Sequence, residues 1–279
     1  MSGPPVVEIE DLYYRYPGGF TALRGITLTV NAGEMVALVG QNGAGKSTLA
    51  RHLNGLLRPA SGRIRICGQD AARLRVSDLA RYVGYVFQNP DHQIFRETVA
   101  EEVAFGPANL ELAPAEVAAR VDAALRFVGL ADKRDVHPYA LSRGERQRVA
   151  LASVLAMQTP VIVLDEPTTG QDYRASLEIM DRVRELNAAG HTIIFITHDM
   201  ELVAQYASRV IVMAQGKVLA DGGIREVFRC PDILAASRLA PPDITCLAQE
   251  LAPFGVSGDI LTVGEMVDVL TPRLGKVRC

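Results

Sequence analysis

The sequence predicts an α/β fold whose central sheet is mixed but mainly parallel. Met35–Val39 is a continuous apolar run typical of a strand buried on both faces, and a glycine-rich turn and a helical pattern over residues 47–57 follow it. Two further apolar runs, at residues 161–164 and 192–197, are separated by a helical segment at residues 174–189. A strand, a helix and a second buried strand in this order form a crossover unit, which makes the two strands parallel.

Other segments depart from this pattern and predict additions to the core. Apolar and polar residues alternate over residues 6–12 and again over residues 26–30, as in the half-buried strands of an antiparallel β subdomain. From about residue 96 to residue 150 the chain is rich in alanine, glutamate, valine and leucine at helical spacing. This pattern predicts a helical insert, which we expect to break at Gly106-Pro107 and to restart at Pro114.

The end of the core is also visible in the pattern. A hairpin over residues 210–219 closes it, and prolines become frequent after residue 228. One more amphipathic stretch follows, at residues 263–270. The sequence therefore predicts a core domain of residues 1–228 and a small C-terminal extension of residues 229–279.

Composition places limits on the function. The chain of 279 residues is 48% hydrophobic and carries a net charge of −3, so it has no overall basic field for nucleic acid or an anionic membrane. The longest apolar runs are far shorter than a bilayer span, and the first residues lack the features of a signal peptide, so we expect a cytosolic protein. The four cysteines are widely spaced, without a CxxC pair for zinc or redox chemistry. Any phosphate that the protein binds must be held locally.

The strongest motif follows the first buried strand and has the pattern GxxxxGK[ST], here GQNGAGKST from Gly40 to Thr48. Its glycines permit positive φ angles and close backbone approach, so that N–H groups at a helix N-terminus can point at phosphate oxygens. Lys46 supplies a charge for the β- and γ-phosphates, and the Ser47 hydroxyl is a hard ligand for Mg²⁺. The alternative, a flexible turn before a helix, is disfavoured by the flanking elements. The expected phosphate-binding residues of this P-loop NTPase core are Gly40, Asn42, Gly43, Gly45, Lys46, Ser47 and Thr48.

Two adjacent carboxylates end the buried strand at residues 161–164, in the sequence VIVLDEP. The carboxyl edge of an open parallel sheet is where such folds bind their ligands. Asp165 is expected to hold Mg²⁺, directly or through water, and Glu166 to polarise the water that attacks in an in-line displacement. Adjacent acids at a strand end can also be ordinary solvated loop residues, but a preceding phosphate loop favours the catalytic interpretation.

The segment LSRGERQR at residues 141–148 resembles the LSGGQ-type signature of ATP-binding cassette (ABC) ATPases, and the resemblance covers about residues 6–228. In that family the signature caps a helix that faces the γ-phosphate of ATP on the partner subunit. The resemblance thus implies that Ser142 and Gly144 complete a site across a dimer, a role that suits a serine cap and a glycine at a helix N-terminus. An ordinary capped helix is the alternative. Two residues depart from the family pattern, Arg143 in place of Gly and Glu145 in place of Gln.

The resemblance implies roles for four more residues. Tyr16 matches the aromatic residue that stacks on adenine, and Gln88 matches the glutamine that reaches Mg²⁺ and the attacking water. His198 matches the switch histidine that contacts the γ-phosphate, and Asp172 the aspartate that communicates between the two sites. The expected catalytic residues are Glu166, His198 and Gln88, and the expected metal ligands are Ser47, Gln88 and Asp165.

Residues 87–95 (FQNPDHQIF) and 97–107 (ETVAEEVAFGP) closely resemble the ATPases of energy-coupling factor transporters, which include cobalt and nickel importers. In these systems a pair of ATPases binds a transmembrane coupling protein with arginine-containing motifs, and a separate membrane subunit binds the cargo. Cobalt, nickel, biotin and other vitamins therefore stay open as cargo. Four acids are candidates for pairing with those arginines, with a solvated acidic helix face as the alternative. They are Asp91, Glu97, Glu101 and Glu102.

These observations predict an Mg²⁺-dependent transport ATPase on the cytoplasmic face of a membrane, acting as a homodimer or as a heterodimer with a homologue. The C-terminal extension would reinforce the dimer. An ABC-type ATPase of DNA repair or chromosome structure, the first alternative, would need a long coiled-coil insert or a basic patch, whereas this insert is compact and acidic. No nucleic-acid partner is therefore expected. A soluble P-loop kinase or GTPase, the second alternative, would have no use for residues 141–148, and the chain has no NKxD guanine motif.

Overall fold

The central sheet confirms the predicted mainly parallel arrangement in a computed structural model that describes residues 3–274. It contains β3 (Met35–Val39), β6 (Val83–Val86), β7 (Val161–Asp165), β8 (Thr192–Ile196), β9 (Arg209–Ala214) and β10 (Lys217–Gly222). Their order in space is β10-β9-β3-β8-β7-β6. Neighbours from β9 to β6 are parallel, and the edge strand β10 is antiparallel to β9. Every residue of β3, β6, β7 and β8 is buried, because layers cover both faces of the sheet.

A second sheet is antiparallel and confirms the predicted N-terminal subdomain. Its strands are β1 (Pro5–Arg15), β2 (Thr21–Asn31), β4 (Ser61–Ile66) and β5 (Gln69–Asp70), in the order β2-β1-β4-β5. Val7, Ile9 and Leu12 of β1 are buried, and they belong to one hydrophobic cluster with Leu49 of α1 (Lys46–Leu53) and one face of the central sheet. The antiparallel sheet and α1 thus cover that face.

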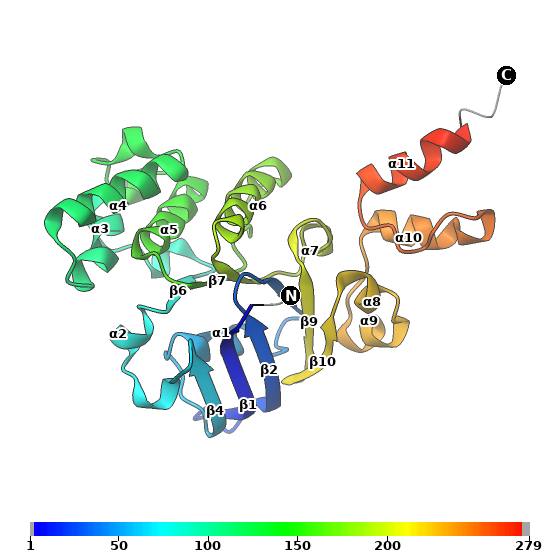
Figure 1. Ribbon diagram of the computed structural model, residues 1–279, viewed down its shortest axis with the longest axis horizontal. Coiled ribbons are helices and arrows are strands. Elements are labelled where there is room, and N and C mark those ends of the chain that lie inside the picture. The colour runs from blue at the N-terminus through cyan, green and yellow to red at the C-terminus, as the bar shows by residue number, and fades with distance from the viewer. Residues whose placement is uncertain (1–2, 275–279) are drawn as a thin grey trace.

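Helices cover the opposite face. They include α3 (Val99–Asn109), α4 (Pro114–Phe127), α5 (Arg143–Met157), α6 (Tyr173–Ala188) and α7 (Met200–Tyr206). The short α2 (Val76–Leu79) instead contributes Leu79 to the cluster that contains Leu49 of α1. Figure 1 shows α3 to α6 on one side of the sheet and β1, β2 and β4 on the other. The short 3₁₀ turns are Ala71–Arg73, Pro90–His92, Ala131–Lys133, Pro138–Ala140 and Ala252–Phe254.

Two predicted helix boundaries are wrong. The helix α3 continues through Gly106-Pro107 to Asn109: the proline removes one backbone hydrogen bond, and the helix ends only two residues after it. The helix α1 ends at Leu53, four residues earlier than predicted, because Gly55 adopts a φ of 76° that no helix continues.

The C-terminal part consists of α8 (Ile224–Phe228), α9 (Pro231–Ser237), α10 (Asp243–Glu250) and α11 (Val263–Leu274). Leu234 of α9 packs in the large cluster of the core, whereas Ala248, Val256, Ile260 and Met266 form a small cluster of their own. We call residues 243–274 the C-terminal lobe, and Figure 1 shows it projecting from the side of β9 and β10. The domain division at residue 228 stays a prediction, and Cys279 lies outside the described residues.

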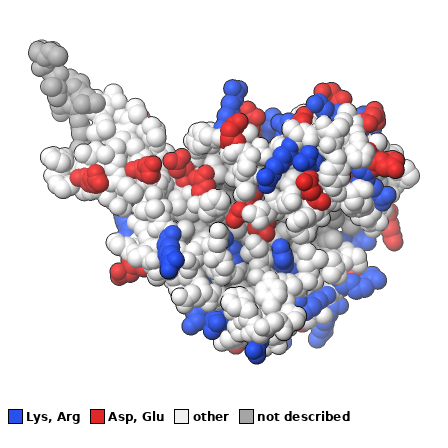
Figure 2. Space-filling view, turned by 180° about the vertical axis from the view of Figure 1, so that it is seen from behind, with Lys and Arg blue, Asp and Glu red and all other residues white. Residues whose placement is uncertain are grey.

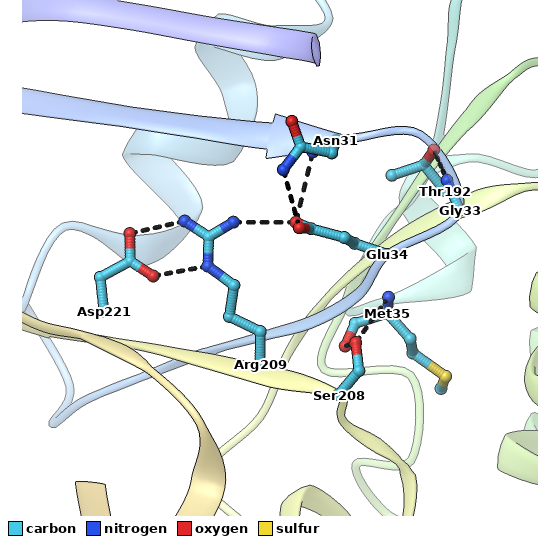
Figure 3. A network of polar contacts seen from close by, with 8 residues as sticks. All are labelled: Asn31, Gly33, Glu34, Met35, Thr192, Ser208, Arg209 and Asp221. Atoms are coloured by element: carbon cyan, nitrogen blue, oxygen red, sulfur yellow. Dashed lines mark hydrogen bonds and ion pairs between the residues drawn. The ribbon is translucent and has the colours of Figure 1, made fainter. Parts of the chain in front are cut away.

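The amino edge of the central sheet carries a closed polar network, shown in Figure 3. Arg209, at the start of β9, binds both carboxylate oxygens of Asp221 at 2.6 and 2.7 Å and reaches Glu34 at 2.8 Å. Glu34 also accepts bonds of 3.2 and 2.9 Å from the backbone and side chain of Asn31. The Thr192 hydroxyl accepts a 3.0 Å bond from the N–H of Gly33. The network joins the end of β2 to β3, β9 and β10.

Among residues 3–274, no helix is long and apolar enough to cross a bilayer.

Candidate active site

The phosphate loop joins β3 to α1 at the opposite, carboxyl edge of the sheet. Gly40, Gly43 and Gly45 adopt φ angles of 143°, 81° and 104°, as the motif predicts. A Cβ at Gly40 would lie 2.1 Å from the carbonyl oxygen of Met213, and one at Gly45 would lie 2.8 Å from that of Ala22. These two glycines are required by close packing as well as by φ, whereas nothing lies within 4 Å of a Cβ at Gly43, which is required by φ alone.

The N-terminus of α1 presents positive charge to the loop. Its first turn contains Lys46, Ser47 and Thr48 and no acid, so the free backbone N–H groups are open to an anion. Lys46 is 6% exposed, and its ammonium donates to the carbonyls of Gly40 at 2.7 Å and Gln41 at 3.1 Å. Burial lowers the pKa of Lys46, and the nearby carboxylates partly oppose this. An anionic ligand would restore the stability of the ammonium, which fits a phosphate.

The Asp165 carboxylate lies at the end of β7, almost fully buried. It accepts a 3.1 Å bond from the Ser47 hydroxyl and a 2.8 Å bond from the Tyr85 hydroxyl. Burial raises the pKa of Asp165, and the two hydrogen bonds oppose this shift. Burial also raises the pKa of Tyr85, so its hydroxyl acts as a donor. A buried carboxylate beside a hydroxyl provides the hard oxygen ligands of Mg²⁺, which needs few protein ligands when phosphate and water supply the others. The residues present therefore fit that ion.

Glu166 is held in a strained conformation next to Asp165. Its φ is 48°, in the left-handed region that non-glycine residues rarely adopt, and such strain is typical of functional residues. Its carboxylate accepts bonds of 2.6 Å from Gln88 Nε2 and 2.9 Å from the Thr169 hydroxyl. His198 Nδ1 lies 3.7 Å from the other carboxylate oxygen. The structure thus brings together the three predicted catalytic residues.

One cavity of about 490 Å³ joins these groups to the phosphate loop. Gly40 and Asn42 lie on one part of its wall, and Gln88, Glu166 and His198 lie on another. Residues 238–243, which precede the C-terminal lobe, also line it. At the first turn of α1, the Tyr16 hydroxyl lies 3.1 Å from that of Thr48, and the half-buried Tyr16 ring meets Tyr14 edge to face. Tyr16 therefore lies beside the phosphate loop, where the resemblance places an adenine ring.

The predicted signature residues lie elsewhere. Ser142 caps α5 and forms a capping box with Glu145, and Asp172 caps α6 by accepting a 2.8 Å bond from Ala175. A Cβ at Gly144 would lie 2.8 Å from Gln171 Oε1, so the two helix N-termini are neighbours. Ser142 and Gly144 line a different cavity, of about 480 Å³. In one copy of the chain, then, they are separate from the catalytic cavity.

Sequence reasoning missed three contributors to the site. Tyr85 and Thr169 bind the two carboxylates, and residues 238–243 form a wall of the cavity. A polar aromatic residue on the fully buried β6 was the available signal for Tyr85, since its hydroxyl needs a partner. Nothing in the sequence linked residues 238–243 to a loop two hundred residues earlier.

The acidic segment requires a correction. Glu102 is only 3% exposed and accepts 2.9 Å bonds from the backbone N–H groups of Phe95 and Arg96, so pairing with an arginine of another protein is ruled out as its role. Asp91 already pairs with Arg146 at 2.8 Å, and Glu101 is part of the capping box of α3. Both residues therefore form contacts that stabilise the fold of this chain. Glu97 stays a candidate for a contact with a partner.

Comparisons with known proteins agree with this geometry. The ABC transporter family model matches residues 23–169. The chain is 48% identical over 248 residues to the energy-coupling factor transporter ATP-binding protein EcfA of Methanocaldococcus jannaschii, covering 88% of this chain and 89% of that protein. It spans 44% to 46% of the length of ABC transporter ATP-binding proteins from Methanosarcina acetivorans, Methanosarcina mazei and Caldanaerobacter subterraneus, with identities of 46% to 48%. It thus covers about half of those relatives.

Solved structures give the same result. The structure of cbiO1 from Clostridium perfringens, described as part of the ABC transporter complex cbiONQ, superposes with a TM-score of 0.75 at 39% identity, covering 88% of this chain and 98% of that one. A dimeric ATP-binding cassette bound to ADP and Pi superposes with a TM-score of 0.71 at 28% identity, over 78% and 98% of the two chains. The chain therefore belongs to the ABC transporter family, as an ATP-binding domain of the energy-coupling factor branch.

Proposed function

We propose that this chain hydrolyses ATP in the cavity between the phosphate loop and the β7 edge. The observation that carries the proposal is the convergence of Gln88, Glu166 and His198 on one wall of a cavity whose other wall is the phosphate loop. Lys46 and the N-terminus of α1 bind the phosphates, and Tyr16 stacks on the base. Ser47, Asp165 and Gln88 are the residues that would hold Mg²⁺, which supplies charge neutralisation and orientation of the phosphates when bound.

The residues of the chain can move one proton in this arrangement. The Glu166 carboxylate accepts a proton from water as the water attacks the γ-phosphate in line with the leaving oxygen. Gln88 and Thr169 fix the carboxylate by donating to it, and His198 faces its other oxygen. Both donors are neutral side chains, so neither forms an ion pair with the carboxylate that is proposed to act as the base.

We further propose that two copies, or this chain and a homologue, close around two nucleotides. Ser142 and Gly144 lie at a helix N-terminus that lines a different cavity from the catalytic one of the same chain. A second copy can bring that N-terminus to the γ-phosphate, where its dipole favours negative charge. ADP has no γ-phosphate, so hydrolysis removes the contact that joins the copies and the pair opens. Asp172 at the start of α6 would transmit the change, and the C-terminal lobe would reinforce the pair.

The partner in the membrane is proposed to be a transmembrane coupling protein that docks beside residues 88–96. Phe95, Phe105 and Tyr139 are 58%, 37% and 51% exposed, and the guanidinium of Arg96 lies over the rings of Phe95 and Phe105 at 5.2 and 4.7 Å. Phe95 and Arg96 follow Gln88 closely in the chain, so an exposed aromatic surface here suits a contact that senses the nucleotide. The relatives are named as an ATP-binding protein of an energy-coupling factor transporter and as part of the ABC transporter complex cbiONQ, which supports a role in transport. We propose that the cargo is a micronutrient such as cobalt, nickel or a vitamin, bound by a further membrane subunit.

The test is the turnover of Glu166→Gln. The amide cannot accept the proton, so we expect ATP hydrolysis to fall about 10²- to 10⁴-fold while the affinity for ATP changes little. Glu201→Gln is the matched control, because Glu201 lines the same cavity without a bond to Gln88 or Thr169, and its turnover should stay within about threefold of wild type. Equal turnover in wild type and Glu166→Gln would overturn the proposal.

A further inference from the structure

A segment from the C-terminal part of the chain forms a wall of the catalytic cavity. Residues 238–243 connect α9 to α10, and they line the cavity together with Asn42, Glu166 and His198. In Figure 1 they lie at the base of the C-terminal lobe. A ligand that fills this cavity must therefore meet the lobe's attachment point as well as the phosphate loop.

Arg238 has a left-handed backbone conformation at the start of this segment. It follows the last residue of α9 with a φ of 51° and a ψ of 41°, where glycine is the favoured residue. The backbone N–H groups of Arg238 and Leu239 close the helix by donating to Ala235 and Leu234. Glu166, with a φ of 48°, is strained in the same way and lines the same cavity. Gln158 closes α5 with the same angles, φ 56° and ψ 41°, so the conformation of Arg238 is that of a common helix C-cap, and the surroundings of its side chain, rather than its backbone, indicate its function.

The charges around Arg238 are mainly negative. Glu166, Glu201 and Asp243 line the cavity with it. Residues 243–272 contain five acidic residues and no lysine or arginine, and two of the five, Asp259 and Glu265, pair with arginines outside that range. Figure 2 shows, from behind, that the lobe stands beyond a notch and carries acidic side chains on its visible face. A polyphosphate bound in this cavity would be repelled by these groups, unless a cation on the same wall opposes them.

Arg238 is the cation that is available for this purpose. Arg225 of α8 and Arg229, the residue after α8, are already paired with Glu265 and Asp259 of the lobe. Within residues 3–272, the guanidinium of Arg238 forms no hydrogen bond or ion pair, and the residue is exposed. Of the described residues that line the cavity, Arg238 is the one lysine or arginine. Its five N–H donors match a phosphate group.

We propose that Arg238 binds the terminal phosphate of ATP and thereby couples the C-terminal lobe to the nucleotide state. The inference rests on the proposed function, because it requires ATP in this cavity. When the terminal phosphate is present, the guanidinium donates to its oxygens and holds residues 238–243 against the phosphate loop. In the ADP state that contact is lost, and the segment is released. Arg238 is then a binding residue supplied by the part of the chain that follows the ABC core.

The first experiment compares two nucleotides on the full chain. The Mg²⁺ complexes of ADP and of the non-hydrolysable ATP analogue AMP-PNP are titrated calorimetrically into wild type, Arg238→Gln and Arg126→Gln. We expect Arg238→Gln to weaken AMP-PNP binding about 5- to 10-fold and ADP binding less than twofold, the size of one charge-assisted contact. Arg126 is another exposed arginine, on α4 and outside the cavity, and its variant should change neither affinity.

Two further variants separate a role in binding from a role in folding. Arg238→Gly relieves the strained φ, so it should raise the thermal midpoint of the nucleotide-free protein while weakening AMP-PNP binding as much as Arg238→Gln does. Asp243→Asn removes an opposing charge from the same wall and should strengthen AMP-PNP binding about twofold. A purely structural role for Arg238 predicts changes in thermal stability without the difference between the two nucleotides.

Three outcomes would overturn the inference. In the first, Arg238→Gln changes the two affinities equally or not at all. In the second, AMP-PNP affinity is unchanged but nucleotide-dependent dimerisation is lost in gel filtration, which would assign Arg238 to the contact between subunits. The third is a wild-type chain that does not distinguish ADP from AMP-PNP. Failure of the proposed function is a different result, because Lys46→Met would then bind both nucleotides as tightly as wild type does.

Discussion

Charged residues lie at both edges of the central sheet, but only at one edge do they pair with one another. At the amino edge, Arg209 is bonded to Asp221 and Glu34, so each charge there faces an opposite charge within 2.8 Å. At the carboxyl edge, Lys46 donates to carbonyl groups, and burial lowers its pKa while raising that of Asp165. The charges of the amino edge are paired within the chain. The carboxyl edge has a buried charge and a strained backbone conformation, for which a bound ligand would compensate.

This difference shows which charges stabilise the fold and which are kept for a ligand. A network whose members satisfy one another gains nothing from a further partner, and breaking it leaves a half-buried charge without its counterpart. A lysine held among carbonyls, or a glutamate at a positive φ, costs stability in the free protein and is retained for function. Matched substitutions at the two edges should therefore separate stability from binding.

The largest expected effect is on nucleotide binding by Lys46→Met. The methionine keeps most of the volume but removes the ammonium at the phosphate loop, so we expect ATP affinity to fall at least about 100-fold. Since burial disfavours the ammonium in the free protein, the free energy of unfolding should change by less than about 1 kcal/mol. Calorimetric titration with Mg²⁺-ATP and urea unfolding measure the two quantities. A loss of stability equal to that of Arg209→Met would contradict the distinction between the edges.

Arg209→Met is the reciprocal test at the amino edge. Removing the guanidinium leaves Glu34 and Asp221 close together without a cation, and we expect a loss of about 2–3 kcal/mol in the free energy of unfolding. ATP affinity should stay within about twofold of wild type, because the network lies where β3 and β9 begin, whereas the phosphate loop follows the end of β3. Urea unfolding and nucleotide titration on the same preparation test both statements. A weakened ATP affinity in a folded Arg209→Met protein would show that the edges are coupled.

The residues at the two edges also differ in how far their positions and roles could be predicted from the sequence. The spacing of Gly40, Gly45 and Lys46 encodes a local loop, so their geometry was predictable from the motif alone. Asp165 was predictable because buried parallel strands present their carboxyl ends at one edge. The role of Glu102 was not predictable from the sequence, because an acidic residue in a helical pattern is expected to be exposed. Its burial depends on the backbone at residues 95–96, whose N–H groups donate to its carboxylate.

Neither the contacts of the amino-edge network nor the position of residues 238–243 could be predicted from the sequence. Glu34 and Arg209 are far apart in the chain, and no local pattern marks an arginine as paired with two particular acids. Arg238 lies in a proline-rich segment whose composition predicts only a loose extension. Contacts of this kind depend on how the elements pack, which the order of elements limits but does not determine.

A smaller effect is expected from Thr169→Val, which tests how firmly the carboxyl edge holds its base. The valine keeps the shape of the side chain but removes the 2.9 Å hydrogen bond to Glu166. We expect kcat to fall about 3- to 10-fold with KM and stability nearly unchanged, because Gln88 still holds the carboxylate. Thr169→Ser restores the hydroxyl and should restore kcat. Equal losses in the valine and serine variants would assign the effect to packing.

The smallest expected effect concerns Glu145, an acid that lies at neither edge and is already satisfied. Hydrogen bonds from Lys133 and from Ser142 lower the pKa of Glu145 to about 2. Because the folded pKa lies below the ordinary value of 4.5, the bonds stabilise the fold above about pH 4.5, and this contribution is lost as the pH falls toward 2. Solvent screening limits it to at most about 1 kcal/mol.

Thermal unfolding of Glu145→Gln against wild type measures that contribution. The variant should be slightly less stable at pH 7, and the difference should shrink as the pH is lowered through 4 toward 2. In a Lys133→Met background the same substitution should have a smaller effect at pH 7, since the largest cause of the shift is gone. A difference that does not vary with pH would mean that Glu145 acts through its shape in the capping box. The charge at the start of α5 would then have no part in stability, and the contrast between satisfied and unsatisfied charges would be confined to the two edges of the sheet.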